Sequence, residues 1–163
     1  MGRTKDTADL LHGNLYIKII EAKDLPNVDT SFFKRKKDVT DPYVSVETYV
    51  GDKETDRLAK TKTIDNDLNP KWLENFDIEI CHELDYIKFM IKDSGSLKSV
   101  NVGSVSISAE DLKKGEEIES WFTIDGSREN NGSIRLSIHF ISKEEQIHMK
   151  YQIVYIQCAV GVP

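Results

Sequence analysis

Hydrophobic and polar residues alternate with a period of two in short segments along most of the chain. The most regular segment is SIRLSIHF, residues 133–140, which has four large apolar residues on one face and polar residues on the other. Such alternation is typical of a β-strand with one buried and one solvated face. The sequence therefore predicts eight strands, over residues 15–22, 43–50, 57–64, 76–80, 86–92, 102–108, 120–125 and 133–140.

The connections between these segments are rich in turn-forming residues, which favours antiparallel strands in a sandwich or barrel. Only residues 108–115, SAEDLKKG, look helical: Ser108 is suited to cap a short helix and Gly115 to end it. Trp72 and Trp121 are expected to complete the core. The pattern indicates an all-β protein.

Composition narrows the classes of function. A chain of 163 residues fits one domain with tails, and its net charge of −6 argues against nucleic acid as a partner. Cys81 and Cys158 are too few and too far apart for a disulfide framework. The longest apolar stretch, YQIVYIQCAVGV, is shorter than the roughly 20 residues of a spanning helix. We therefore expect a cytoplasmic protein whose anion binding depends on a local basic patch.

Several loop motifs occur in a fixed order between the strands. Asp29 follows the first strand, TDPY with Asp41 precedes the second, NPKW precedes the fourth, and Asp93 ends the fifth. In this order the motifs resemble the C2 domain, a calcium- and lipid-binding β-sandwich, over residues 13–142. The expected fold is an eight-stranded antiparallel β-sandwich of the C2 type with the extra strand at the C-terminus.

The flanking residues fall outside this resemblance. Residues 1–12 are expected to be an N-terminal tail, and residues 143–163 a linker or the start of a following region. The ending VGVP is similar to the point where the catalytic region of plant-type phospholipase D begins. The segments KKGEEIESWFTI and NGSIRLSIHF are similar to the C2 domain at the N-terminus of the same family.

The catalytic motif of phospholipase D is His-x-Lys followed, after four residues, by Asp. His148 and Lys150 match its start, but Tyr155 stands where the carboxylate is required. We therefore expect this chain to carry no catalytic residues. The resemblance implies that it targets or regulates a phospholipase D-like catalytic region that follows it covalently.

The resemblance also implies a calcium site at one end of the sandwich. Asp29, Asp41 and Asp93 match the ligand aspartates of the family by position, and Asn101 offers an uncharged oxygen. Calcium takes about six to eight oxygen ligands, whereas Gly95 stands where the family often has a further acid, so a weak site is expected. The alternative for Asp41 is that an Asp-Pro pair only shapes a turn.

An insertion between the first two of these aspartates combines aromatic and basic residues. Its candidate membrane-binding residues are Phe32, Phe33, Lys34, Arg35, Lys36 and Lys37. In the loop that faces the membrane in C2 domains, aromatics enter the interface, and each basic residue near anionic lipid contributes about 1 kcal/mol. The alternatives are phenylalanines folded back onto the sandwich, lysines that are simply solvated, and a nuclear localisation signal.

Lys60 and Lys62 lie on the expected third strand, where lysines of some C2 domains bind phosphoinositides. An ordinary solvated strand face is the alternative, because acidic residues are interspersed nearby. Taken together, the residues and the resemblance predict calcium-assisted binding to anionic phospholipid membranes by a peripheral membrane protein. A calcium-independent lipid- or protein-interaction module is the alternative function.

Overall fold

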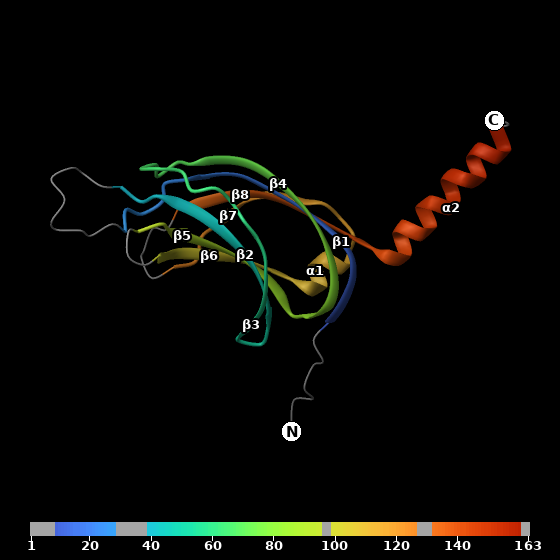
Figure 1. Cartoon of the computed structure of the whole chain (residues 1–163), viewed down its shortest axis with the longest axis horizontal. Helices are drawn as coiled ribbons and strands as arrows, with labels where there is room; N and C mark the ends of the chain where they lie inside the picture. Colours follow the sequence, from blue (N-terminus) through green and yellow to red (C-terminus); the bar gives the residue numbers. More distant parts are fainter. Residues whose placement is uncertain (1–8, 29–38, 96–98, 127–131, 161–163) are drawn as a thin grey trace, which may run out of the picture.

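The structure is a computed structural model that describes residues 9–28, 39–95, 99–126 and 132–160. Within these residues, eight strands form two four-stranded antiparallel sheets that pack face to face (Figure 1). The elements are β1 (Asp9–Lys23), β2 (Pro42–Val50), β3 (Lys53–Lys60), β4 (Lys71–Leu84), β5 (Tyr86–Asp93), β6 (Val100–Ser108), α1 (Ala109–Lys113), β7 (Ile118–Thr123), β8 (Ser133–Ser142) and α2 (Lys143–Val160). The antiparallel strands expected from the alternation are confirmed, and of the sandwich and the barrel it is the sandwich implied by the C2 resemblance that forms.

The last strand completes the sheet in which the first strand lies. Sheet A has the order β4-β1-β8-β7, and sheet B has the order β3-β2-β5-β6. β8 pairs with β1 from Gly13↔Ser142 to Lys23↔Ser133, with one irregularity between Ile19 and Glu21. The extra strand therefore lies at the C-terminus, as expected.

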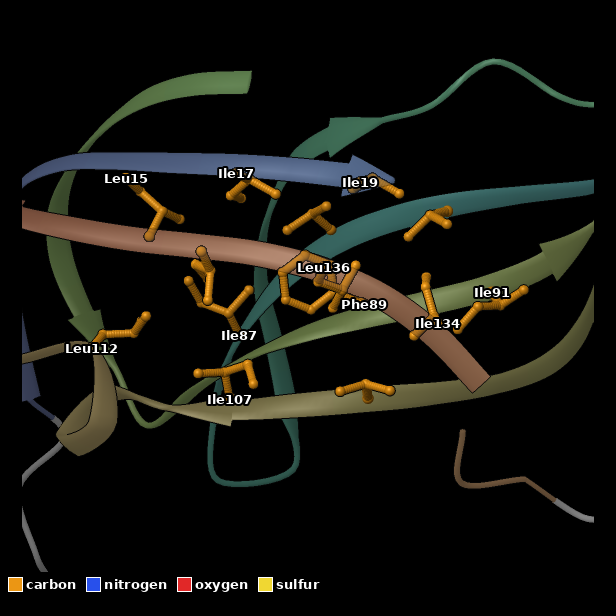
Figure 2. Close-up of a cluster of buried hydrophobic side chains, with 14 of the residues drawn as sticks. Leu15, Ile17, Ile19, Ile87, Phe89, Ile91, Ile107, Leu112, Ile134 and Leu136 are labelled. Carbon is orange, nitrogen blue, oxygen red and sulfur yellow. The ribbon is translucent and has the colours of Figure 1, made fainter. Parts of the chain in front are cut away.

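Phe89 of β5 is fully buried between the two sheets, in the same cluster of buried side chains as Leu136 of β8 (Figure 2). Branched aliphatic side chains from both sheets surround it, as the inward positions of alternating strands require. Trp72 is buried in the same core, which confirms its expected place. The expectation for Trp121 is wrong: it is 40% exposed, because it lies on the outer face of the edge strand β7.

The one short helix expected from the sequence is present at the end of β6. The Ser108 hydroxyl accepts a hydrogen bond from the Asp111 backbone N–H at 3.1 Å, which satisfies a free donor of the first turn. Gly115 has φ of +68°, a left-handed conformation that glycine adopts without strain after a helix. Both capping predictions are confirmed.

Residues 143–160, expected to belong to a linker or a following region, form the helix α2, which extends away from the sandwich (Figure 1). Its first turns are attached: the Gln146 side chain donates to Asn14 Oδ1 at 3.0 Å, and Lys143 Nζ lies 3.7 Å from Glu79 Oε1. Its later turns expose apolar side chains, including Tyr151 and Ile156. Among the described residues, no helix is long and apolar enough to cross a membrane.

A chain that ends at Ser142 is expected to lose less than about 2 kcal/mol of the free energy of unfolding, because α2 is attached by a few exposed contacts. Urea unfolding followed by circular dichroism measures this difference. The single variant Gln146→Ala gives the part due to one hydrogen bond. A loss as large as that of a core substitution would contradict the prediction and make α2 part of the folding unit.

Candidate functional site

Four connections leave the sandwich at one end, which we call the loop end. They are residues 24–41, 61–70, 94–99 and 124–132. The Leu25 N–H donates to the Leu68 carbonyl at 3.0 Å, and the Ser94 N–H donates to the Asp41 carbonyl at 3.0 Å. These backbone bonds join connections that are far apart in the sequence. The loop end lies opposite α1 and α2 (Figure 1).

Thr40 fixes the two ends of the first connection to each other. Its side chain is fully buried, its hydroxyl donates to the Pro26 carbonyl at 3.0 Å, and the same oxygen accepts from the Val28 N–H at 3.0 Å. The sequence interpretation missed this residue, although threonine before an Asp-Pro pair is a common turn signal. Thr40 therefore holds Asp41 in a defined place at the start of β2.

Asp41 and Asp93 are brought together by the pairing of β2 with β5. Pro42 lies opposite Asp93 in this ladder, and the Asp41 N–H donates to Asp93 Oδ1 at 2.7 Å. The Asp93 side chain is buried, so its carboxylate is held at this position rather than free in solvent. Two of the four residues expected to bind metal therefore contact each other directly.

Asn66 is a further residue of the loop end that sequence reasoning missed. Its N–H donates to Asp41 Oδ1 at 2.6 Å, and its side-chain oxygen accepts from the Val39 N–H at 3.1 Å. Asn66 has φ of +51°, a left-handed conformation that asparagine tolerates better than most residues. Asp41 thus also takes part in the turn chemistry that was the alternative to metal binding.

Calcium prefers carboxylate and carbonyl oxygens, and the pair of Asp41 and Asp93 fits it as part of a site. Asn101 is exposed on β6, one residue beyond Val100, which lies opposite Asp93. Asp29 lies outside the described residues. Among the residues that are described, no group of three or more acidic, histidine or cysteine side chains is arranged to hold a metal ion.

The aromatic and basic insertion also lies outside the described residues. This applies to Phe32, Phe33, Lys34, Arg35, Lys36 and Lys37. The ends of the connection that carries them, Val28 and Val39, are described and lie at the loop end. Their membrane role therefore stays a prediction.

The two candidate phosphoinositide-binding lysines lie in different surroundings. Lys60 Nζ is 4.0 Å from the centre of the Tyr43 ring, a cation–π distance. Lys62 is exposed, and its backbone N–H donates to Glu74 Oε1 at 2.8 Å. Both lysines are exposed, and they differ in that Lys60 contacts the Tyr43 ring of β2.

A buried carboxylate on the same sheet was not foreseen from the sequence. Glu47 is 1% exposed, and it accepts hydrogen bonds from Lys92 Nζ at 2.8 Å, Ser45 Oγ at 2.8 Å and the Tyr49 hydroxyl at 3.0 Å. Burial by itself raises the pKa of Glu47, but these hydrogen bonds and the charge of Lys92 lower it, and the net shift is downward. Burial and the bond to Glu47 raise the pKa of Tyr49 to about 12.

Comparison with known proteins agrees with this geometry. A family model for the C2 domain matches residues 13–124. Phospholipase D gamma 3 of Arabidopsis thaliana is 33% identical over 180 aligned positions, which cover 95% of this chain and 20% of that protein. Phospholipase D alpha 1 of Oryza sativa subsp. japonica is 30% identical, covering 88% of this chain and 18% of that protein. The chain thus spans about a fifth of the length of these relatives.

Solved structures with the same fold include the two calcium-bound C2 domains, A and B, of Extended-Synaptotagmin 2. That structure superposes with a TM-score of 0.64 at 26% identity, covering 81% of this chain and 46% of that one. The first C2 domain, domain A, of plant Extended Synaptotagmin 1 superposes with a TM-score of 0.62 at 16% identity, covering 81% of this chain and 96% of that one, and shows the fold alone. The chain belongs to the C2 domain family, and its curated relatives are the C2 regions of plant phospholipases D.

Proposed function

We propose that this C2 domain binds anionic phospholipid membranes through its loop end, with the assistance of calcium. The observation that carries the proposal is the 2.7 Å contact between the Asp41 N–H and the Asp93 carboxylate, which joins two expected ligands from two connections. Membership of the C2 family and the likeness to a calcium-bound relative support it.

Asp41 and Asp93 would hold the ion, with Asp29 and Asn101 as the further ligands proposed from the sequence. Calcium, when bound, would offset the negative charge of these carboxylates and attract lipid phosphate. Burial keeps the Asp93 carboxylate in place before binding, so little ordering of this side chain is needed. The bond from Asn66 to Asp41 Oδ1 leaves the other carboxylate oxygen of Asp41 without a partner among the described residues.

The residues proposed to enter or touch the lipid are those of the insertion. Phe32 and Phe33 would lie at the boundary between headgroups and acyl chains, and the basic run after them would meet anionic headgroups. Lys62, which is solvated, is better placed than Lys60 to meet a phosphoinositide, because Lys60 already contacts Tyr43. The protein would be cytoplasmic and would reach the membrane on recruitment.

We also propose that the domain targets or regulates a phospholipase D-like catalytic region. Support comes from the curated relatives, in which the matched part is about a fifth of the protein. The later turns of α2 expose apolar side chains on several sides, and a helix of that kind is normally buried against a partner. Contact between α2 and the catalytic region would cover these side chains.

The test is cosedimentation with vesicles of phosphatidylcholine and phosphatidylserine, with calcium or with chelator. Calcium is expected to increase binding, and Asp93→Asn is expected to weaken the calcium-dependent part about tenfold. An asparagine oxygen can still accept from the Asp41 N–H, so the variant removes charge while keeping the fold. Asp52→Asn, at an exposed aspartate in the turn between β2 and β3, is the control and is expected to bind like wild type.

Two other outcomes would change the function. Equal binding with calcium and with chelator would remove calcium from the mechanism and leave the insertion as the anchor. A double substitution of Phe32 and Phe33 by serine would then test that anchor. No binding to vesicles in either condition would favour the alternative, a protein-interaction module.

A further inference from the structure

Three exposed side chains lie on the side of sheet A next to the loop end, and we call them the sheet A patch. Lys23 is the last residue of β1, Trp121 lies two residues before the end of β7, and Leu73 is the third residue of β4. Trp121 is 40% exposed and Leu73 is 62% exposed. Each of these three residues lies near the end of its strand that joins the loop end.

Trp121 and Lys23 form a pair suited to a membrane interface. The Lys23 ammonium lies 4.4 Å from the centre of the Trp121 ring, across the strand β8 that separates β1 from β7. Tryptophan is enriched at the headgroup level of bilayers, where its ring is partly buried and its N–H stays hydrated. A lysine beside it adds attraction to anionic headgroups. The pair therefore presents both parts of a lipid anchor at one place.

Leu73 combines exposure with a strained backbone. Its φ of +53° is left-handed, which costs a leucine about 1–3 kcal/mol and is more frequent at functional sites. The same stretch contains the irregularity in the pairing of β1 with β4 between Ile19 and Glu21. This bulge accounts for the backbone conformation of Leu73. It leaves most of the apolar side chain in solvent, where it is available to an apolar partner.

The charges beside the patch are balanced. Lys71 Nζ lies 3.8 Å from Glu21 Oε2, and Arg135 is bonded to Glu119 at 2.6 Å. With Lys23 and the exposed Asp24 that follows it, this row has three basic side chains and three carboxylates, in a chain whose net charge is −6. Farther from the loop end, sheet A carries exposed acidic residues. They are Asp77 and Glu79 of β4 and Glu117 before β7.

We propose that the sheet A patch is a second contact with the anionic phospholipid surface. The domain would then contact the membrane with one edge of sheet A as well as with its loops. Repulsion between anionic lipid and the acidic part of the sheet would limit how far the domain tilts toward the membrane. The proposal rests on the proposed function, because loop-end binding brings the patch to the lipid. It differs from that function in assigning lipid contact to β1, β4 and β7.

The fluorescence of Trp121 tests this contact in the whole chain. Trp72, in the core, is the only other tryptophan, so the difference between wild type and Trp121→Phe isolates Trp121. With phosphatidylcholine–phosphatidylserine vesicles and calcium, the Trp121 emission is expected to move to shorter wavelength, and quenching by acrylamide is expected to fall. Vesicle binding with no change in the Trp121 emission would overturn the proposal that the sheet A patch contacts lipid.

Sheet A offers a matched control for each residue of the patch. Trp121→Ala is compared with Tyr16→Ala, since both side chains are 40% exposed, and Leu73→Asn with Leu10→Asn, since both are 62% exposed. Lys23→Glu is compared with Lys18→Glu on the same strand. Tyr16 lies five residues before Glu21 on β1. At the rise of a strand, Tyr16 is therefore roughly 17 Å farther from the loop end than Glu21 is.

The first variant of each pair is expected to weaken vesicle binding about tenfold, and the second less than about twofold. Asparagine is used for leucine because it adopts left-handed backbone more readily. Equal effects within all three pairs would overturn the patch but leave the proposed function, which depends on Asp93 and the insertion. No vesicle binding by wild type would overturn both. If Trp121→Ala does not fold, the fluorescence difference between wild type and Trp121→Phe still decides whether Trp121 contacts lipid.

Discussion

Phe89→Ala is expected to lower the free energy of unfolding by about 3–5 kcal/mol. The ring is fully buried at the centre of the core, where both sheets contribute neighbours (Figure 2). Removing it leaves a cavity that rigid strands fill only in part. Since domains are stable by about 5–15 kcal/mol, the variant is expected to lose a large fraction of its stability. Urea unfolding followed by circular dichroism measures the loss.

The same substitution is also expected to affect the candidate calcium site. Phe89 and Asp93 belong to the same strand, β5, so loosened packing of β5 is expected to weaken calcium-dependent binding as well. Tyr16→Ala is the control, because it removes an aromatic ring that is 40% exposed, and it is expected to cost less than about 1 kcal/mol. A loss below about 1 kcal/mol for Phe89→Ala would mean that the core collapses around the missing ring.

Glu47→Ala is expected to cost about 3–5 kcal/mol, because it removes a buried carboxylate and leaves the partly buried Lys92 ammonium without this partner. The Lys92 side chain is only 19% exposed, and its ammonium is bonded to Glu47 at 2.8 Å. The Ser45 and Tyr49 hydroxyls lose their acceptor in the same change. Thermal or urea unfolding measures the loss.

Two further variants show how much of this cost is due to the charge of Glu47 and how much to its burial. Glu47→Gln is expected to cost less than Glu47→Ala, because the amide oxygen still accepts from Lys92. Glu119→Ala breaks an exposed pair with Arg135 on the other sheet, 2.6 Å apart, and is expected to cost less than about 1 kcal/mol. If Glu47→Ala and Glu119→Ala cost the same, the buried pair contributes no more than a surface pair.

The Glu47 network also predicts a dependence of stability on pH. The pKa of Glu47 is lowered from its ordinary value of 4.5, since the bonds from Lys92 and Ser45 outweigh burial. A lowered pKa contributes stability above about pH 4.5 that is lost as the pH falls through the folded-state pKa. Wild type is therefore expected to lose more stability than Glu47→Gln between about pH 7 and pH 3. Parallel losses in the two proteins would contradict this.

Most strands could be predicted from the sequence because alternation records directly which face of a strand is buried. β3 shows where this fails: the expected strand covered residues 57–64, whereas β3 is Lys53–Lys60. β3 is an edge strand, and its residues 53–57 are all exposed, so no buried face marks its start. For α2, the sequence combined charged and apolar residues with no regular apolar face, and a linker or the start of a following region was the expectation.

For the candidate site too, some features could be predicted from the sequence and others could not. The sequence by itself predicted antiparallel strands from their alternation, and the order of the loop motifs, through the C2 resemblance, predicted the sandwich and the candidate aspartates, because these depend on local patterns and on the order of motifs. Only the tertiary structure decided that Asp41 meets Asp93, 52 residues away, and that Glu47 meets Lys92, 45 residues away. It also decided that Trp121 faces solvent beside Lys23. Such contacts depend on which strands pair and in what register, and that is set by burial over the whole chain rather than by any one segment.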